Sequence, residues 1–141
     1  MSVGYDKFIG YRIDITEEFK SLEERNEKFH DSLLFSKSSP ESLKNLGYVP
    51  YFETSKFKKG DITIIYDGMN GEYTYLILIQ AANINSYYYD ENDNVDEYIN
   101  EMLSTFSISK EIINRLNQIY KLIFDTENKK EIECKVFVHV T

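Results

Sequence analysis

The chain has 141 residues, of which 15% are aromatic and 42% hydrophobic, and it carries a net charge of −8 at pH 7. This length and composition predict one folded domain over residues 1–141 and exclude intrinsic disorder. The single cysteine, Cys134, excludes an internal disulfide and a cysteine-based zinc site. No apolar run reaches the ~18 residues of a membrane-spanning helix, and no secretory signal is recognisable. We therefore expect a soluble cytoplasmic protein that does not bind membranes.

The first third of the chain predicts a strand and two helices. Residues 8–15 alternate apolar and polar side chains, which is the pattern of a half-buried strand. Thr16 is a suitable N-cap for a helix that runs to about His30 or Leu34. Ser39-Pro40-Glu41 predicts the start of a second, short helix, and Gly47 its end. The apolar stripe of the first helix consists of Phe19, Leu22, Phe29 and Leu33.

A β-hairpin follows in the middle of the chain. Residues 61–66 alternate and are rich in β-branched side chains, residues 67–71 contain two turn dipeptides, and residues 72–80 return as a strand. The returning strand is apolar on both faces, because Leu76 and Leu78 alternate with Ile77 and Ile79. Both of its faces should therefore be covered, and the strand should lie centrally in a sheet.

The last third predicts two helices and a strand, at residues 95–106, after Ser109 and at residues 132–140. Together these elements predict an α+β domain with a four-stranded, mainly antiparallel sheet and helices packed on one face. The order suggests a split-βαβ, ferredoxin-like sandwich. The two helical stripes are Val95, Tyr98, Ile99, Met102, Leu103 and Phe106, and then Ile112, Ile113, Leu116, Ile119, Tyr120 and Ile123.

The negative charge is concentrated in one segment. Residues 1–60 contain ten acids and ten bases, whereas residues 61–141 contain fourteen acids and six bases. Residues 87–101 alone hold six carboxylates and four tyrosines without a lysine or arginine. Tyrosine provides a large contact area with little side-chain entropy to lose, and acidic groups steer a basic partner. The predicted partner-binding residues are Tyr87, Tyr88, Tyr89, Asp90, Glu91, Asp93, Asp96, Glu97 and Glu101.

The same segment has two other interpretations. Oxygen-bearing side chains at alternating positions, followed by a distal glutamate, resemble a calcium-binding loop made by Asp90, Asn92, Asn94, Asp96 and Glu101. Val95 occupies the position where such a loop needs glycine, and Glu97 a position that is normally apolar. Alternatively, the carboxylates cap the N-terminus of the helix over residues 95–106, where negative charge is stabilising.

Both histidines lie in His-x-Ser/Thr triplets, His30-Asp31-Ser32 and His139-Val140-Thr141. This pair resembles the two motifs of the 2H phosphoesterase family. The resemblance covers six residues and implies phosphodiester cleavage, with His30 and His139 as acid and base and the hydroxyls of Ser32 and Thr141 on the phosphate. Asp31 departs from the pattern, because that position is usually apolar. The alternative is that His30 is a solvated helix residue and His139 a strand residue.

Other chemistries lack their motifs. The sequence contains no nucleotide-binding glycine loop, zincin motif or nucleophile elbow, and we expect no cofactor. Cys134 fits a buried, inert thiol. Glu23, Glu24 and Glu27 fit a solvated helix face. The basic residues at 56–59 are better explained as solubilising an edge or loop, because the net charge repels nucleic acid.

The sequence therefore favours a small, acidic, non-catalytic binding protein that engages a basic protein surface, such as an inhibitor or regulator that imitates the charge of nucleic acid. Residues with A/T-rich codons number 64, whereas Gly, Ala, Arg and Pro together number 13. This bias suggests a low-GC bacterium or one of its phages, and a phage protein would act in the host cytoplasm. The phosphodiesterase and the calcium module are the alternatives, and the oligomeric state is left open.

Overall fold

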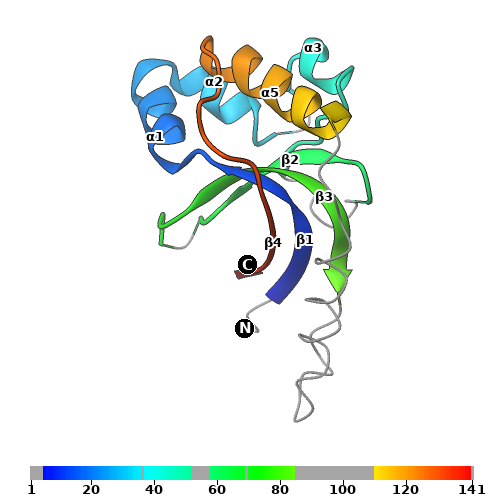
Figure 1. Ribbon diagram of the computed structural model, residues 1–141. Coiled ribbons are helices and arrows are strands. Elements are labelled where there is room, and N and C mark those ends of the chain that lie inside the picture. Colours follow the sequence, from blue (N-terminus) through cyan, green and yellow to red (C-terminus); the bar gives the residue numbers. More distant parts are fainter. Residues whose placement is uncertain (1–4, 36, 52–57, 69, 85–109, 141) are drawn as a thin grey trace.

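The computed structural model describes residues 5–35, 37–51, 58–68, 70–84 and 110–140. These residues form four strands and four helices, and the helices gather on one side of the sheet (Figure 1). The elements in chain order are β1 (Tyr5–Asp14), α1 (Thr16–Arg25), α2 (Glu27–Ser32), α3 (Glu41–Lys44), β2 (Ile62–Tyr66), β3 (Thr74–Ile84), α5 (Lys110–Phe124) and β4 (Glu133–Val140).

The sheet has the strand order β2-β3-β1-β4, and each neighbouring pair is antiparallel. β1 therefore lies between β3 and β4, and β3 lies between β2 and β1. The connection from β1 to β2 passes over one strand, and so does the connection from β3 to β4, as expected for a split-βαβ arrangement. The predicted α+β class with a four-stranded antiparallel sheet and helices is confirmed.

The main core lies between the helices and the sheet. The predicted inward residues of α5 are confirmed from Leu116 onward, and Leu116 and Ile119 are fully buried. Alternate residues of β1 and β3 face these helices, since side chains along a strand point to opposite sides. The buried cluster includes Tyr11, Ile13, Ile15, Phe19, Leu22, Leu33, Leu76, Leu78, Leu116, Ile119 and Ile123.

β3 is buried on both faces, as its sequence predicts. Leu76 and Leu78 belong to the main core, whereas Ile77 and Ile79 form a second buried cluster with Ile65. Thr63 pairs with Ile77 across the sheet and so lies on this second face, because directly paired residues share a face. Its side chain is fully buried, and its hydroxyl has no hydrogen-bond partner among the described residues.

Gly10 marks a close approach between β1 and β3. A Cβ atom at this position would lie 2.4 Å from the backbone oxygen of Leu78. The pairing register of β1 with β3 also shifts between Ile9 and Gly10. Only glycine lets the two central strands come this close, which explains a glycine in the interior of β1.

The helix predicted to run from Thr16 to about His30 or Leu34 is in fact two helices. Asn26 separates α1 from α2 with a non-helical backbone (φ −153°, ψ 75°), and its side chain accepts a hydrogen bond from the Phe29 amide at 3.2 Å. Asparagine favours such caps because its side chain competes for backbone hydrogen bonds. Thr16 is the first helical residue of α1 and not its cap. The Thr16 amide donates a hydrogen bond to the Asp14 carboxylate at 3.0 Å.

The segment between α2 and β2 also differs from the prediction in one detail. The sequence Ser39-Pro40-Glu41 suggests Ser39 as the cap of α3 and Pro40 as its first residue, but Pro40 precedes the helix and the Ser39 hydroxyl donates to the Ser32 carbonyl at 2.9 Å. Gly47 ends this segment in the left-handed region (φ +93°), as predicted. Beyond it, Val49 donates to the Ile62 carbonyl and Ile62 to the Gly47 carbonyl, so the segment pairs with the start of the outer edge of β2.

Candidate functional site

The acidic segment predicted to bind a partner lies outside the described residues. This applies to all nine residues named for partner binding and to all five named for calcium. The described elements that flank it are β3, whose pairing with β1 reaches Lys7↔Ile84, and α5, which begins at Lys110. The segment is therefore the connection between a central strand and the longest described helix.

The sequence places most of the charge in this connection. Residues 85–109 contain six carboxylates and no lysine or arginine, whereas the described residues contain 17 acids and 15 bases. The described part of the protein is therefore close to charge balance. An electrostatic attraction for a basic partner would originate mainly from the connection between β3 and α5.

The two His-x-Ser/Thr triplets lie at opposite ends of the sheet. His30 belongs to α2 and lies 6.5 Å from Tyr66, ring centre to ring centre, near the Asp14 end of β1. His139 pairs with Asp6, eight residues farther along β1. At ~3.3 Å per residue, His139 is roughly 26 Å along the sheet from that end. The backbone register thus does not bring the two histidines to one phosphate. Thr141 lies outside the described residues.

His30 is buried, in contrast to the solvated position considered from the sequence. Only 3% of it is exposed, and its ring packs on Phe19 with the ring centres 4.1 Å apart. The break at Asn26 makes this possible, because it reorients α2 relative to α1. His30 thereby becomes a core residue with two polar ring atoms that need partners.

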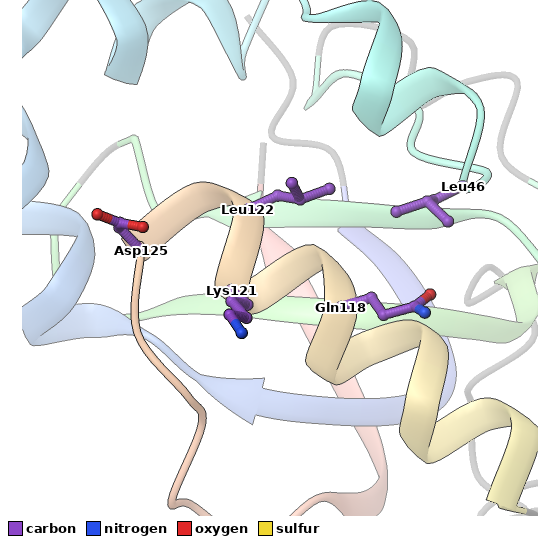
Figure 2. Close-up of a pocket in the computed structure, with 5 residues that line it drawn as sticks. All are labelled: Leu46, Gln118, Lys121, Leu122 and Asp125. Atoms are coloured by element: carbon purple, nitrogen blue, oxygen red, sulfur yellow. The ribbon is translucent and has the colours of Figure 1, made fainter.

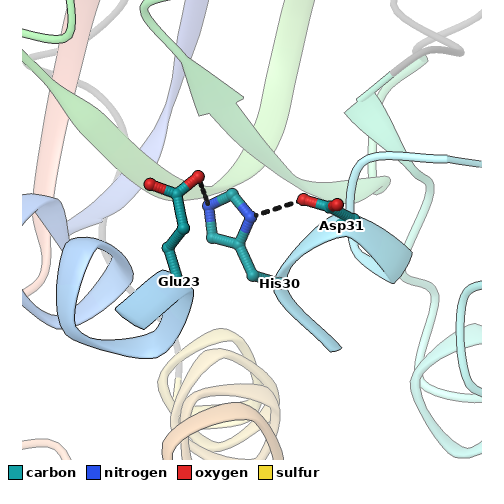
Figure 3. Close-up of side chains that lie close together, drawn as sticks. All are labelled: Glu23, His30 and Asp31. Carbon is teal, nitrogen blue, oxygen red and sulfur yellow. Dashed lines mark hydrogen bonds and ion pairs between the residues drawn. The ribbon is translucent and has the colours of Figure 1, made fainter. Parts of the chain in front are cut away.

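Two carboxylates flank the His30 ring on opposite sides, as Figure 3 shows. Nδ1 lies 3.0 Å from Asp31 Oδ1, and Nε2 lies 3.8 Å from Glu23 Oε2. Both carboxylate side chains are about half exposed, at 55% for Glu23 and 48% for Asp31. Ser32, the third member of the triplet, donates to the Phe29 carbonyl at 2.6 Å and so stabilises the end of α2.

Sequence reasoning missed this cluster because it assigned Glu23 to a solvated helix face. The spacing held a signal, since Glu23 and His30 are seven residues apart and would share a face of a continuous helix. Among the described residues, Glu23, His30 and Asp31 form a group whose ligand atoms lie close enough together to hold a metal ion.

A pocket of about 460 Å³ lies beside α5 (Figure 2). Leu46 and Leu122 supply its apolar surface, and Leu122 is 49% exposed. Lys121 stands at its rim and forms an ion pair with Glu127 at 3.0 Å, which raises the pKa of the lysine. Gln118 and Asp125 complete the lining. The pocket can hold an apolar group between charges of both signs. Leu122 lies outside the predicted inward stripe of α5. An apolar residue on the outer face of that helix was the sequence signal that could have indicated the pocket.

Cys134 is a free, half-buried thiol on β4 that packs against the main core. Burial raises its pKa, so the thiol is protonated at neutral pH and is a poor nucleophile.

No helix in the described ranges is long and apolar enough to cross a membrane. Comparison of the chain with protein-family models, with curated proteins and with solved structures finds no match.

Proposed function

We propose that this protein is a non-catalytic binding protein that engages a basic protein surface through its acidic, tyrosine-rich segment, residues 87–101. The observation that supports the proposal is the concentration of charge. Residues 85–109 hold six carboxylates without a counter-charge, while the described scaffold is nearly neutral. An inhibitor or regulator of a nucleic-acid-binding protein would need such a surface, because its target is itself positively charged.

The described elements on either side of the segment also suit this role. Binding residues commonly lie on connections that a rigid scaffold holds in place. Here the connection begins at β3, which is buried on both faces, and ends at α5, which packs on the main core. Clustered charge accelerates the approach of an oppositely charged partner, and the tyrosines then supply apolar contact area.

The experiment compares two variants with the same net charge. In the first, the segment is neutralised by Asp93→Asn, Asp96→Asn and Glu97→Gln. In the matched control, three exposed carboxylates of the scaffold are neutralised by Glu24→Gln, Glu72→Gln and Glu131→Gln. Binding of each protein to protamine, a strongly basic protein, is measured by fluorescence anisotropy at ~0.05 M and ~0.5 M salt, between which electrostatic screening increases strongly.

We expect the segment variant to bind protamine at least ~10-fold more weakly than the wild type at low salt, and the control to bind nearly as well as the wild type. The difference should disappear at high salt. Equal weakening in both variants would mean that only the total charge matters, and the proposal would then be wrong. Affinity capture from cells of the source organism, repeated with the same three proteins, extends the test to the natural partner.

A further inference from the structure

The His30 cluster has an arrangement that a simple buried histidine does not need. An ionised carboxylate can only accept hydrogen bonds, so the 3.0 Å contact with Asp31 Oδ1 requires a proton on Nδ1. In the neutral ring, Nε2 then carries a lone pair. That lone pair is directed towards the Glu23 carboxylate, 3.8 Å away and beyond hydrogen-bond distance.

Two acceptors that face each other need something positive between them. A second proton on the ring would meet this requirement, and so would a metal ion. The spacing suits an ion: Zn²⁺ binds histidine nitrogen at about 2.0–2.1 Å and carboxylate oxygen at about 2.0–2.2 Å, so two ligand atoms in a tetrahedral site lie roughly 3.4 Å apart. Glu23 is 55% exposed, and a small rotation of its side chain would close the remaining few tenths of an ångström.

The surroundings of the ring resemble those of metal-binding histidines in a second respect. Such histidines usually donate their other ring N–H to a carboxylate, which fixes the tautomer and the orientation of the ring. Asp31 occupies that position here. The contact with Phe19 and the edge contact with Tyr66 hold the imidazole in place. The exposed sides of Glu23 and Asp31 leave a path for an ion and for the water that would complete its coordination.

We propose that Nε2 of His30 and the carboxylate of Glu23 bind a divalent transition-metal ion of the zinc type, with Asp31 as the residue that positions the imidazole. Imidazole favours zinc, copper and nickel over calcium and magnesium, which prefer oxygen ligands alone. Two protein ligands make this an open site, in which water occupies the other coordination positions. The site is independent of the acidic segment, since its three residues belong to α1 and α2.

The test uses the untagged, full-length protein, labelled with ¹⁵N and titrated with ZnCl₂ at constant pH. The imidazole nitrogens are followed by long-range ¹H–¹⁵N correlation spectroscopy, which reports on His30 separately from His139. We expect the Nε2 resonance of His30 to shift on addition of zinc while Nδ1 keeps its proton. The same titration with CaCl₂ should leave both nitrogens unchanged.

Four variants locate the ion. Glu23→Gln removes a ligand without touching the core and should weaken zinc binding at least ~10-fold, and Asp31→Asn should weaken it by about 10–100-fold, as for other orienting partners. Glu24→Gln changes the neighbouring exposed carboxylate by the same charge and should bind like the wild type. Cys134→Ser should also bind like the wild type, which excludes the thiol.

Several results would overturn the proposal. These are an Nε2 resonance that ignores zinc, a zinc response of the same strength in Glu23→Gln and in the wild type, and a calcium response equal to that of zinc. All four variants keep the buried His30 itself, so a loss of zinc binding is not confused with the loss of a core side chain.

Discussion

Replacing Tyr120 by phenylalanine tests the contact between α5 and α1, because the change removes a single oxygen atom. Tyr120 is 5% exposed, and its hydroxyl donates to Glu18 Oε2 at 3.0 Å. The other oxygen of this carboxylate pairs with Lys130 Nζ at 2.8 Å, so Glu18 is ionised when it accepts the bond. A hydrogen bond to a charged group contributes about 1.5–3 kcal/mol. We therefore expect Tyr120→Phe to lower the free energy of unfolding by about that amount at pH 7.

The pH dependence of this difference gives a second, independent measure. Burial and the hydrogen bond to Glu18 raise the pKa of Tyr120 from 10.0 to about 12. Because the folded pKa is the higher one, the stabilisation is complete below pH 10 and is lost as the pH rises towards 12. At pH 11 the wild type should have lost roughly 1 kcal/mol of it. Phenylalanine cannot ionise, so the difference between the two proteins should shrink by the same amount.

Urea denaturation followed by far-ultraviolet circular dichroism measures both quantities. The wild type and Tyr120→Phe are compared at about pH 7 and pH 11, with equal m-values as the requirement for comparing free energies. Tyr66→Phe is the control, since the Tyr66 hydroxyl makes no hydrogen bond to another described side chain. This substitution should change the free energy of unfolding at pH 7 by less than about 0.5 kcal/mol. A difference between wild type and Tyr120→Phe that is absent at pH 7, or that is the same at both pH values, would refute the reasoning.

Three further substitutions test the core by the same denaturation assay. Tyr48→Phe removes a buried hydroxyl that donates to the Leu33 carbonyl at 2.6 Å, and it should destabilise the protein by about 1–3 kcal/mol; an unchanged midpoint would contradict this. Gly10→Ala places a methyl group 2.4 Å from the Leu78 carbonyl oxygen and should destabilise by about 1–3 kcal/mol through strain between the central strands; wild-type stability would show that the strands separate freely. Thr63→Val replaces a buried hydroxyl that no described residue bonds, and it should stabilise by about 1 kcal/mol; a loss of stability would indicate a hidden partner.

The features that follow from short-range periodicity were predicted well. The alternation in residues 61–66, the apolar run within residues 72–80 and the glycine-containing turn between them specify the hairpin without reference to the rest of the chain. The same holds for α5, whose apolar residues recur at helical spacing. Apolar residues on both faces of β3 also predicted its central place in the sheet.

The features that depend on tertiary contacts were not predicted. Asn26 breaks the helix because its side chain bonds the Phe29 amide, yet asparagine also occurs inside helices, and nothing nearby in the sequence distinguishes the two cases. The His30 ring contacts Phe19, eleven residues earlier, because of that break, since the two residues would lie about 16 Å apart along a continuous helix. The spacing of Glu23 and His30 indicates a shared helix face, but the approach of the Glu23 carboxylate to the imidazole depends on the same break between the two helices.

The two edges of the sheet are protected to different degrees, which matters for how the protein could associate with others. At β2, the backbone of residues 47–49 occupies hydrogen-bonding groups at the start of the strand, so a foreign strand has little room to dock there. β4 is the last strand on the other side, and its exposed Glu133 and Lys135 place charge along that margin. Among the described residues no strand pairs with the outer side of β4, so a peptide or a second copy that extends the sheet there would meet these charges, and substitutions of Glu133 and Lys135 would be the means to control it.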